Sequence, residues 1–260
     1  MTLAKEQDGA PCGESSASDL KGLCWTGGIA ALILIVYSLA TIVQLIVLGG
    51  PPATAAEAFR LLQSNRFMGL LRLDLPTVVA MPLYYFLFLG LFAALRRTDC
   101  ANAILPTALV FVGVTLLLAT PTALSMISLS QKYAAATTEA TRTQLLAAGE
   151  AILATDIWHG TGAIMGGVLV QSGAVLISVV MLRSSVFGKA TAYLGIVMHG
   201  LDLAHIVSGI FLPDSGVVLM AIAGPLYPIW LFLVGRRLLQ LAATGSSRGK
   251  GEPSGTATHN

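Results

Sequence analysis

Six long apolar stretches, each with hardly a charge inside it, make up most of this 260-residue chain. A helix needs roughly 20 apolar residues to cross the hydrocarbon core of a membrane, and an isolated open strand cannot satisfy its backbone there. The pattern therefore predicts an all-α protein, a polytopic membrane bundle of six transmembrane helices. The predicted spans are Trp25–Gly49, Leu75–Leu95, Asn102–Ser128, Ile157–Leu182, Ala190–Leu212 and Gly216–Val234.

The composition supports a chain whose main solvent is lipid. Hydrophobic residues account for 55% of the chain and charged residues for only 11%, whereas a soluble domain carries about 25% charged residues. The net charge is only +2 and the chain has no long basic run, so we do not expect a nucleic-acid partner. Membrane lipids are the expected partners, and the sequence leaves the oligomeric state open.

The ends of the chain and its cations predict an orientation. We expect flexible cytoplasmic tails at 1–24 and 241–260, around a transmembrane domain at 25–240. Cytoplasmic segments of membrane proteins carry an excess of Lys and Arg. We expect the protein to lie in the inner (plasma) membrane of a bacterial cell with both termini in the cytoplasm. In that orientation ten cations lie on the cytoplasmic side and five on the outer side. The inside set is Lys5, Lys21, Arg96, Arg97, Arg183, Lys189, Arg236, Arg237, Arg248 and Lys250, and the outside set is Arg60, Arg66, Arg72, Lys132 and Arg142.

The two long outer loops have amphipathic patterns. In residues 54–73, apolar residues such as Phe59 and Leu62 alternate with Arg60 and Arg66 at near-helical spacing. This pattern predicts a helix lying in the membrane interface. In residues 138–156, apolar residues recur on one helical face, which predicts a helix that runs into the fourth span. We expect it to pack on the bundle rather than to act as a substrate lid.

The fifth span is exceptional because it holds three ionisable residues, His199, Asp202 and His205. Their spacing of three places them across one broad face of a helix. Asp156 and His159 have the same spacing at the start of the fourth span. Together with Asp74, at the mouth of the second span, these groups are expected to line one polar funnel that opens to the outer side.

Three interpretations fit this set. The side chains can be a structural network, since polar groups in membrane bundles hydrogen-bond across helices for about 0.6 kcal/mol each. They can be a metal-dependent hydrolase site, in which His159, His199, His205 and Asp202 bind a divalent ion such as zinc. They can also form a proton or transport pathway, because His titrates near neutral pH. The candidate catalytic carboxylates are Asp156, Asp202 and Asp74, and HExxH and phosphate-binding motifs are absent.

Weaker polar and small residues add expectations about packing. Gln44 and Gln171 are predicted to form interhelical hydrogen bonds. The run Gly162-x-x-x-Gly166, continued by Gly167 and Gly173, gives the fourth span a smooth face for close helix contact, which we expect to be internal. An aromatic set can either line a pocket or simply pack in the core. This set is Tyr84, Tyr85, Tyr227 and Trp230.

Three segments resemble an uncharacterised bacterial six-span membrane protein family, domain of unknown function 4386. They are FGKATAYLGIV at 187–197, Gly149-Glu150-Ala151, and PLYPIWLFLVG at 225–235. The resemblance implies six membrane helices and no assigned activity, and its pattern does not require His199, Asp202 or His205. The expected function is therefore that of a multi-pass protein that binds a lipid or small apolar ligand. The hydrolase and the transporter are the alternatives, and no cofactor is predicted besides the metal of the hydrolase.

Overall fold

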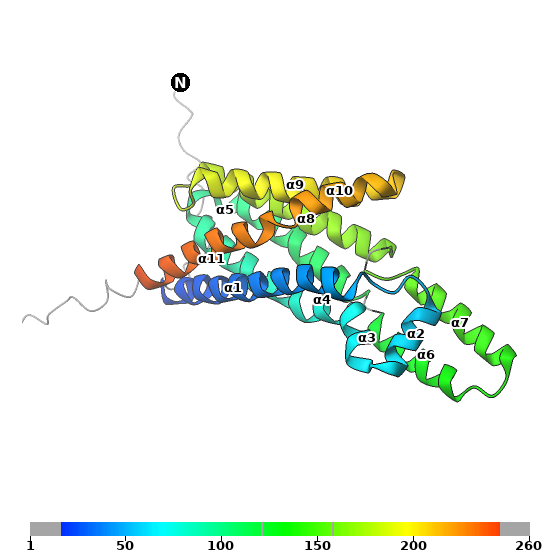
Figure 1. The fold of residues 1–260 in the computed structure, drawn as a ribbon. Helices are drawn as coiled ribbons and strands as arrows, with labels where there is room; N and C mark the ends of the chain where they lie inside the picture. The colour runs from blue at the N-terminus through cyan, green and yellow to red at the C-terminus, as the bar shows by residue number, and fades with distance from the viewer. Residues whose placement is uncertain (1–16, 121, 158, 245–260) are drawn as a thin grey trace, which may run out of the picture.

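A computed structural model describes residues 17–120, 122–157 and 159–244 of the chain. These residues form eleven helices and no strand, so the all-α prediction is confirmed. Figure 1 shows a bundle of long helices with a smaller helical lobe at one end. The helices are α1 (Ala17–Leu48), α2 (Ala55–Ser64), α3 (Arg66–Arg72), α4 (Leu75–Ala80), α5 (Pro82–Leu118), α6 (Ala123–Ala135), α7 (Glu139–Leu153), α8 (Thr161–Arg183), α9 (Lys189–Phe211), α10 (Pro213–Ala223) and α11 (Leu226–Thr244).

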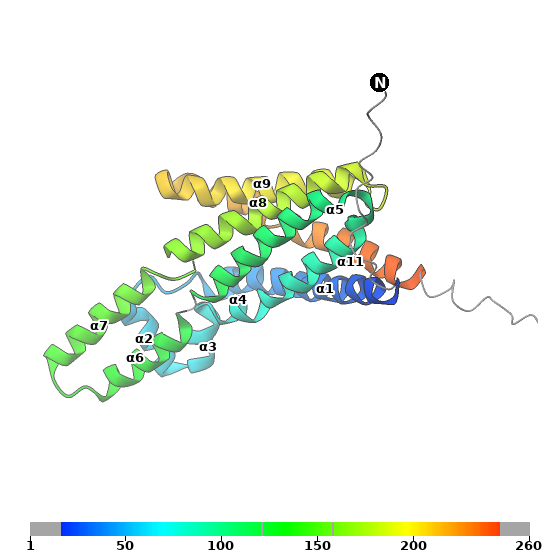
Figure 2. The same ribbon diagram turned by 180° about the vertical axis from the view of Figure 1, so that it is seen from behind.

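Within the described residues, six helical segments are long and apolar enough to cross a membrane, which confirms the predicted number. The chain is a multi-pass membrane protein. The start of α1 and the end of α11 lie at the same end of the bundle (Figures 1 and 2). The candidate spans are Leu20–Leu48, Leu75–Arg96, Thr98–Ala135, Thr161–Arg183, Lys189–Phe211 and Val218–Thr244.

The ends of the bundle differ from the predicted tail boundaries. Helix α1 begins at Ala17, before the predicted start at Trp25, because Leu20, Leu23 and Cys24 already pack on the core. Helix α11 continues to Thr244, since Leu238 is buried and Leu241 packs beside it. Residues 1–16 and 245–260 of the predicted tails lie outside the described residues.

The helices and the spans do not coincide one to one. Helix α5 consists of two legs that meet at Asp99, where the backbone is extended (φ −160°, ψ 88°), and this bend lies at the junction of the second and third spans. The Asp99 carboxylate accepts hydrogen bonds from the backbone and side chain of Asn102 and so caps the second leg. The sixth span is divided into α10 and α11 at Gly224–Pro225, because proline cannot donate the backbone bond that a continuous helix needs. Helix α11 thus starts inside the span, next to the polar residues described below.

Glycines on the fourth span bring α8 against the second leg of α5. A β-carbon on Gly166 would lie 2.8 Å from the carbonyl oxygen of Gly113, and one on Gly173 would lie 2.6 Å from that of Pro106. Both distances are too short for a larger residue, so the backbones touch. The contact is internal to this chain, as expected from the small-residue face. Helices α1 and α11 pack in the same way through Gly28 and Gly235.

The lobe is built from α2, α3, α6 and α7 and has its own apolar core (Figure 1). Phe59 and Leu62, expected to face lipid from an interfacial helix, are buried against α6 and α7. A helix in this segment is confirmed, and its apolar face is covered by other helices of the lobe instead of facing lipid. Helix α7 does not run into the fourth span, because it ends at Leu153 and α8 begins at Thr161. It packs on α2 and α6.

Hydrogen bonds at helix ends join the lobe together. The Glu150 carboxylate of α7 accepts a hydrogen bond from the backbone nitrogen of Ala55, at 2.8 Å, and so caps α2. Arg72 donates to Glu57 and to the carbonyl oxygen of Gly50, both at 3.0 Å. The candidate span Thr98–Ala135 has 38 residues, far more than the roughly 20 that a membrane requires. Its last part, α6, therefore projects beyond the bundle into the lobe.

Candidate functional site

A polar network joins three helices in the middle of the bundle. Gln171 of α8 and His199 of α9 are each the eleventh of 23 residues in their helices, counted from Thr161 and Lys189. Asp202 follows on α9, and Tyr227 comes from the first turn of α11. The residues meet here because α9 packs against both α8 and α11. At this depth an ionisable side chain is costly to bury, so its partners must compensate.

Gln171 is the centre of this network. Its Nε2 donates to Asp202 Oδ2 at 2.5 Å and lies 2.9 Å from the hydroxyl oxygen of Tyr227. Its carbonyl oxygen Oε1 lies 2.6 Å from His199 Nδ1. The Tyr227 hydroxyl donates to Asp202 Oδ2 at 2.8 Å. The predicted interhelical role of Gln171 is confirmed, and Gln44 likewise donates to the carbonyl oxygen of Leu71.

The directions of these bonds fix the chemistry of His199. Because Gln171 Oε1 can only accept, His199 Nδ1 must carry the proton. The other ring nitrogen, Nε2, is then an acceptor in the neutral imidazole. His199 is 1% exposed, and its Nε2 is buried without a hydrogen-bond partner among the described residues. The Nε1–H donor of Trp230 is likewise buried without a hydrogen-bond partner among the described residues.

His199, Trp230 and Gly195 form the tightly packed base of the network. The rings of His199 and Trp230 meet edge to face, with centroids 4.9 Å apart. A β-carbon on Gly195 would lie 2.4 Å from Ser178 Oγ and 2.5 Å from Trp230 Nε1. Position 195 therefore requires glycine, because Ser178 and Trp230 approach the backbone of α9 too closely for a larger residue. Trp230 packs in the core, which decides between the two roles that the sequence allowed for it.

Asp202 is only half-buried, unlike His199. Its Oδ2 accepts from both Gln171 and Tyr227, while its Oδ1 has no hydrogen-bond partner among the described residues. His205, one turn further along α9, lies within electrostatic range of Asp202. Tyr84 of α5 interacts electrostatically with Asp202 and with Tyr37 of α1. The carboxylate thus has an amide and a hydroxyl as direct partners, from helices α8 and α11.

Asp156 and His159 lie elsewhere, in the turn between α7 and α8. Asp156 Oδ1 accepts from the backbone nitrogen of His159 at 2.8 Å and lies 2.9 Å from its Nδ1. The His159 side chain is 69% exposed. No hydrogen bond joins this pair to the network around Gln171 among the residues that the structure describes. These residues were predicted to share a helical face at the start of the fourth span, but they precede α8, which begins at Thr161, and contact each other within the turn.

Asp74 has a structural role at the junction of bundle and lobe. Its carboxylate accepts hydrogen bonds from the backbone and hydroxyl groups of Thr122 and, at 3.0 Å, from the backbone nitrogen of Ala123. These groups are the unpaired donors at the start of α6, where a carboxylate is favoured by the helix dipole. Asp74 is 3% exposed, so it does not open to a funnel.

The predicted single funnel is therefore wrong, because its members have three separate sets of partners. In the described parts of the chain, no three His, Cys, Asp or Glu side chains lie close enough to hold a metal ion. His159 in particular is engaged in its turn, away from the partners of His199. Asp202, His199 and His205 remain together on α9, and the residues that complete their site are Gln171 and Tyr227. The sequence alone already singled out Gln171, because it is an amide within an otherwise apolar span.

Comparison with known protein families, with curated proteins and with solved structures finds no match to this chain. The resemblance to the bacterial six-span family therefore stays a prediction.

Proposed function

We propose that this protein binds, inside the membrane, a lipid or small apolar molecule that carries an amine. The observation that carries the proposal is the state of Asp202. One carboxylate oxygen is held by Gln171 and Tyr227, and the other has no partner among the described residues. A carboxylate at this depth usually has a counter-ion or a functional reason to be there.

The hydrogen bonds favour a ligand that donates. In the chain from His199 through Gln171 to Asp202, every donor points toward the carboxylate. Oδ1 of Asp202 is an acceptor without a hydrogen-bond partner among the residues that the structure describes. An ammonium group supplies both the donor and the opposite charge, and charge-assisted bonds are about twice as strong as neutral ones. Tyr227, which donates to Oδ2, also brings an aromatic ring close to the carboxylate.

The site also borders the break in the sixth span. Tyr227 lies in the first turn of α11, directly after Gly224–Pro225. Broken helices in membrane proteins are tolerated where the freed backbone lies against protein or lines a cavity, and binding sites often form there. Asp202 is half-buried at this point, whereas His199, one turn deeper, is enclosed. The ligand therefore approaches from the Asp202 side of the network.

The test uses three photoactivatable alkyl probes of equal length that end in an amine, an alcohol or a carboxylate. The purified full chain is irradiated with each probe, and labelled peptides are identified by mass spectrometry. We expect the amine to label peptides of α9 and α11, and Asp202→Asn to reduce that labelling about tenfold or more, since bonds to charged groups contribute about 1.5–3 kcal/mol. Asp156→Asn is the matched control, because Asp156 is a carboxylate in the turn before α8. Equal labelling by amine and carboxylate probes, or no effect of Asp202→Asn, would refute the proposal.

We further propose that the protein lies in a bacterial inner membrane with both termini in the cytoplasm and the lobe outside. The distribution of cations supports this orientation, and the resemblance to a bacterial family supports the bacterial membrane. Thr137→Cys, at the exposed turn between α6 and α7, should react with a membrane-impermeant maleimide in intact cells. Ser185→Cys, in the exposed turn between α8 and α9, should react only after permeabilisation. The unmodified chain gives the background from native cysteines, and the reverse pattern would invert the orientation.

A further inference from the structure

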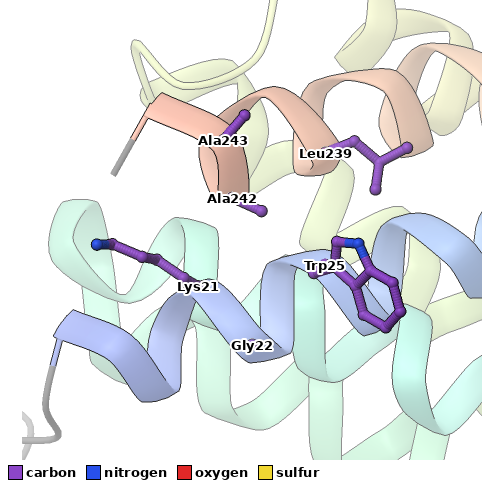
Figure 3. A pocket seen from close by; sticks show the side chains of 6 residues that line it. All are labelled: Lys21, Gly22, Trp25, Leu239, Ala242 and Ala243. Carbon is purple, nitrogen blue, oxygen red and sulfur yellow. The ribbon is translucent and has the colours of Figure 1, made fainter. Parts of the chain in front are cut away.

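A groove lies between α1 and α11 near the end of the bundle where these two helices begin and end (Figure 3). Its volume is about 520 Å³. Gly22, Ala242 and Ala243 leave the space open because they have small side chains or none. The lining residues are Lys21, Gly22, Trp25, Leu239, Ala242 and Ala243.

The groove combines a cation, an indole and an apolar wall. Lys21 and Trp25 are four residues apart, so they share one face of α1. Trp25 is 55% exposed beside the groove. The span in α1 begins at Leu20 and the span in α11 ends at Thr244, which places the groove at the boundary between membrane and water. Lysine and tryptophan are the side chains that favour this boundary.

A second cation lies on the same face of α11 as the groove. Arg236 precedes Leu239 by three residues and Ala243 by seven, so the three share a helical stripe. Arg236 is exposed, and its long side chain can extend along the helix toward the boundary. Lys21 thus lines a pocket with an apolar floor, and Arg236 lies further into the span on the same stripe of α11. Basic pockets between membrane helices suit anionic headgroups.

We propose that this groove binds one anionic phospholipid, with the headgroup phosphate at Lys21 and an acyl chain along Trp25 and Leu239, and that Arg236 adds positive charge nearby. The apolar wall explains why the ligand is a lipid rather than a free anion. The charges explain why the lipid is anionic rather than zwitterionic. This site is separate from the network at Asp202 and does not depend on the ligand proposed there.

Native mass spectrometry of the full chain in detergent tests the proposal. The protein is mixed with phosphatidylglycerol or with phosphatidylcholine of the same acyl chains. We expect one phosphatidylglycerol to be retained about fivefold better than phosphatidylcholine, from the attraction of cations near the membrane surface. Equal retention of the two lipids would overturn the proposal. Competition by millimolar inorganic phosphate would identify a site for a free anion and would also overturn it.

Two variants separate charge from shape. Lys21→Gln removes the cation, and Ala243→Leu fills the groove while leaving every charge in place. Both should abolish the preference for phosphatidylglycerol. Lys189→Gln is the matched control, because Lys189 is an exposed lysine in the first turn of α9 and does not line the groove. If Lys189→Gln lowers the preference as much as Lys21→Gln, the attraction belongs to the whole surface and the groove proposal is wrong. Circular dichroism confirms that each variant is folded.

Discussion

Two pairs of histidine and aspartate in this protein have the same spacing and opposite environments. Asp156 and His159 contact each other directly within a turn, where Asp156 is buried and the His159 side chain is 69% exposed. His199 is 1% exposed, and Gln171 from a different helix bridges it to Asp202. The contact in the first pair is local to the turn, while the second pair is joined by a residue from another helix. Spacing alone therefore does not tell whether such a pair is a local turn or an intramembrane site.

The difference has an energetic consequence. Solvent reaches the His159 ring and screens its contact with Asp156, and ion pairs with a solvent-exposed member contribute about 0–1 kcal/mol. In the apolar interior, a polar group without its partner carries a penalty of roughly 1–3 kcal/mol. The variants below test this contrast through unfolding in mixed micelles titrated with sodium dodecyl sulfate, which gives the free energy of unfolding.

The largest effect is expected from Gln171→Ala. The change removes the bridge and leaves His199 Nδ1 without its partner, while the carboxylate of Asp202 keeps only Tyr227. We expect the free energy of unfolding to fall by about 3 kcal/mol. Gln44→Ala is the control, because Gln44 makes a single hydrogen bond to the backbone of Leu71. A loss at Gln171 no larger than that at Gln44 would show that the network adds nothing as a unit.

Gly195→Ala tests how tightly the bundle encloses His199. The added methyl group would collide with Ser178 Oγ and Trp230 Nε1, so helix α9 must shift. We expect a loss of about 2 kcal/mol. Gly200→Ala is the control on the same helix, since a β-carbon there meets no atom within 4 Å. This control should be neutral or slightly stabilising, because alanine favours a helix more than glycine does. Equal effects at the two glycines would contradict the tight packing.

Asp74→Ala tests a buried carboxylate whose partners are mainly backbone groups, whereas those of Asp202 are side chains. It removes the cap of α6 at Thr122 and Ala123. A loss of about 1.5 kcal/mol is expected, within the range for helix caps. The lobe should also become more sensitive to limited proteolysis. Thr138→Ala removes a cap on the exposed start of α7 and serves as the comparison. Unchanged proteolysis of the lobe in Asp74→Ala would argue against the capping role.

The smallest effect is expected from His159→Ala. Its side chain is mostly exposed and contacts Asp156 within the same turn. The free energy of unfolding should change by less than about 0.5 kcal/mol. Labelling by the amine probe should stay at the level of the unmodified chain. A strong loss of either would mean that the turn and the network are coupled, and the contrast between the two pairs would fail.

Some of this architecture could be predicted because it follows from the solvent. Long apolar runs require helices in lipid, which gave the number of spans correctly. The small-residue face of α8 predicted close packing for the same reason. The pattern of α2 could not show what covers its apolar face, because side chains such as Phe59 and Leu62 can be buried equally well in a membrane surface or against other helices. Only the positions of α6 and α7 distinguish these outcomes.

The sequence by itself determined that the chain is a six-span helical membrane protein with ionisable residues concentrated on α9, since hydropathy and helical spacing are local properties. Only the tertiary structure decided which of those residues act together. It joined Asp202 and His199 to Gln171 and Tyr227, and it assigned Asp74 and Asp156 to a helix cap and a turn. The physical reason is that a hydrogen bond depends on contact between side chains that lie far apart along the chain, such as those of residues 171 and 227.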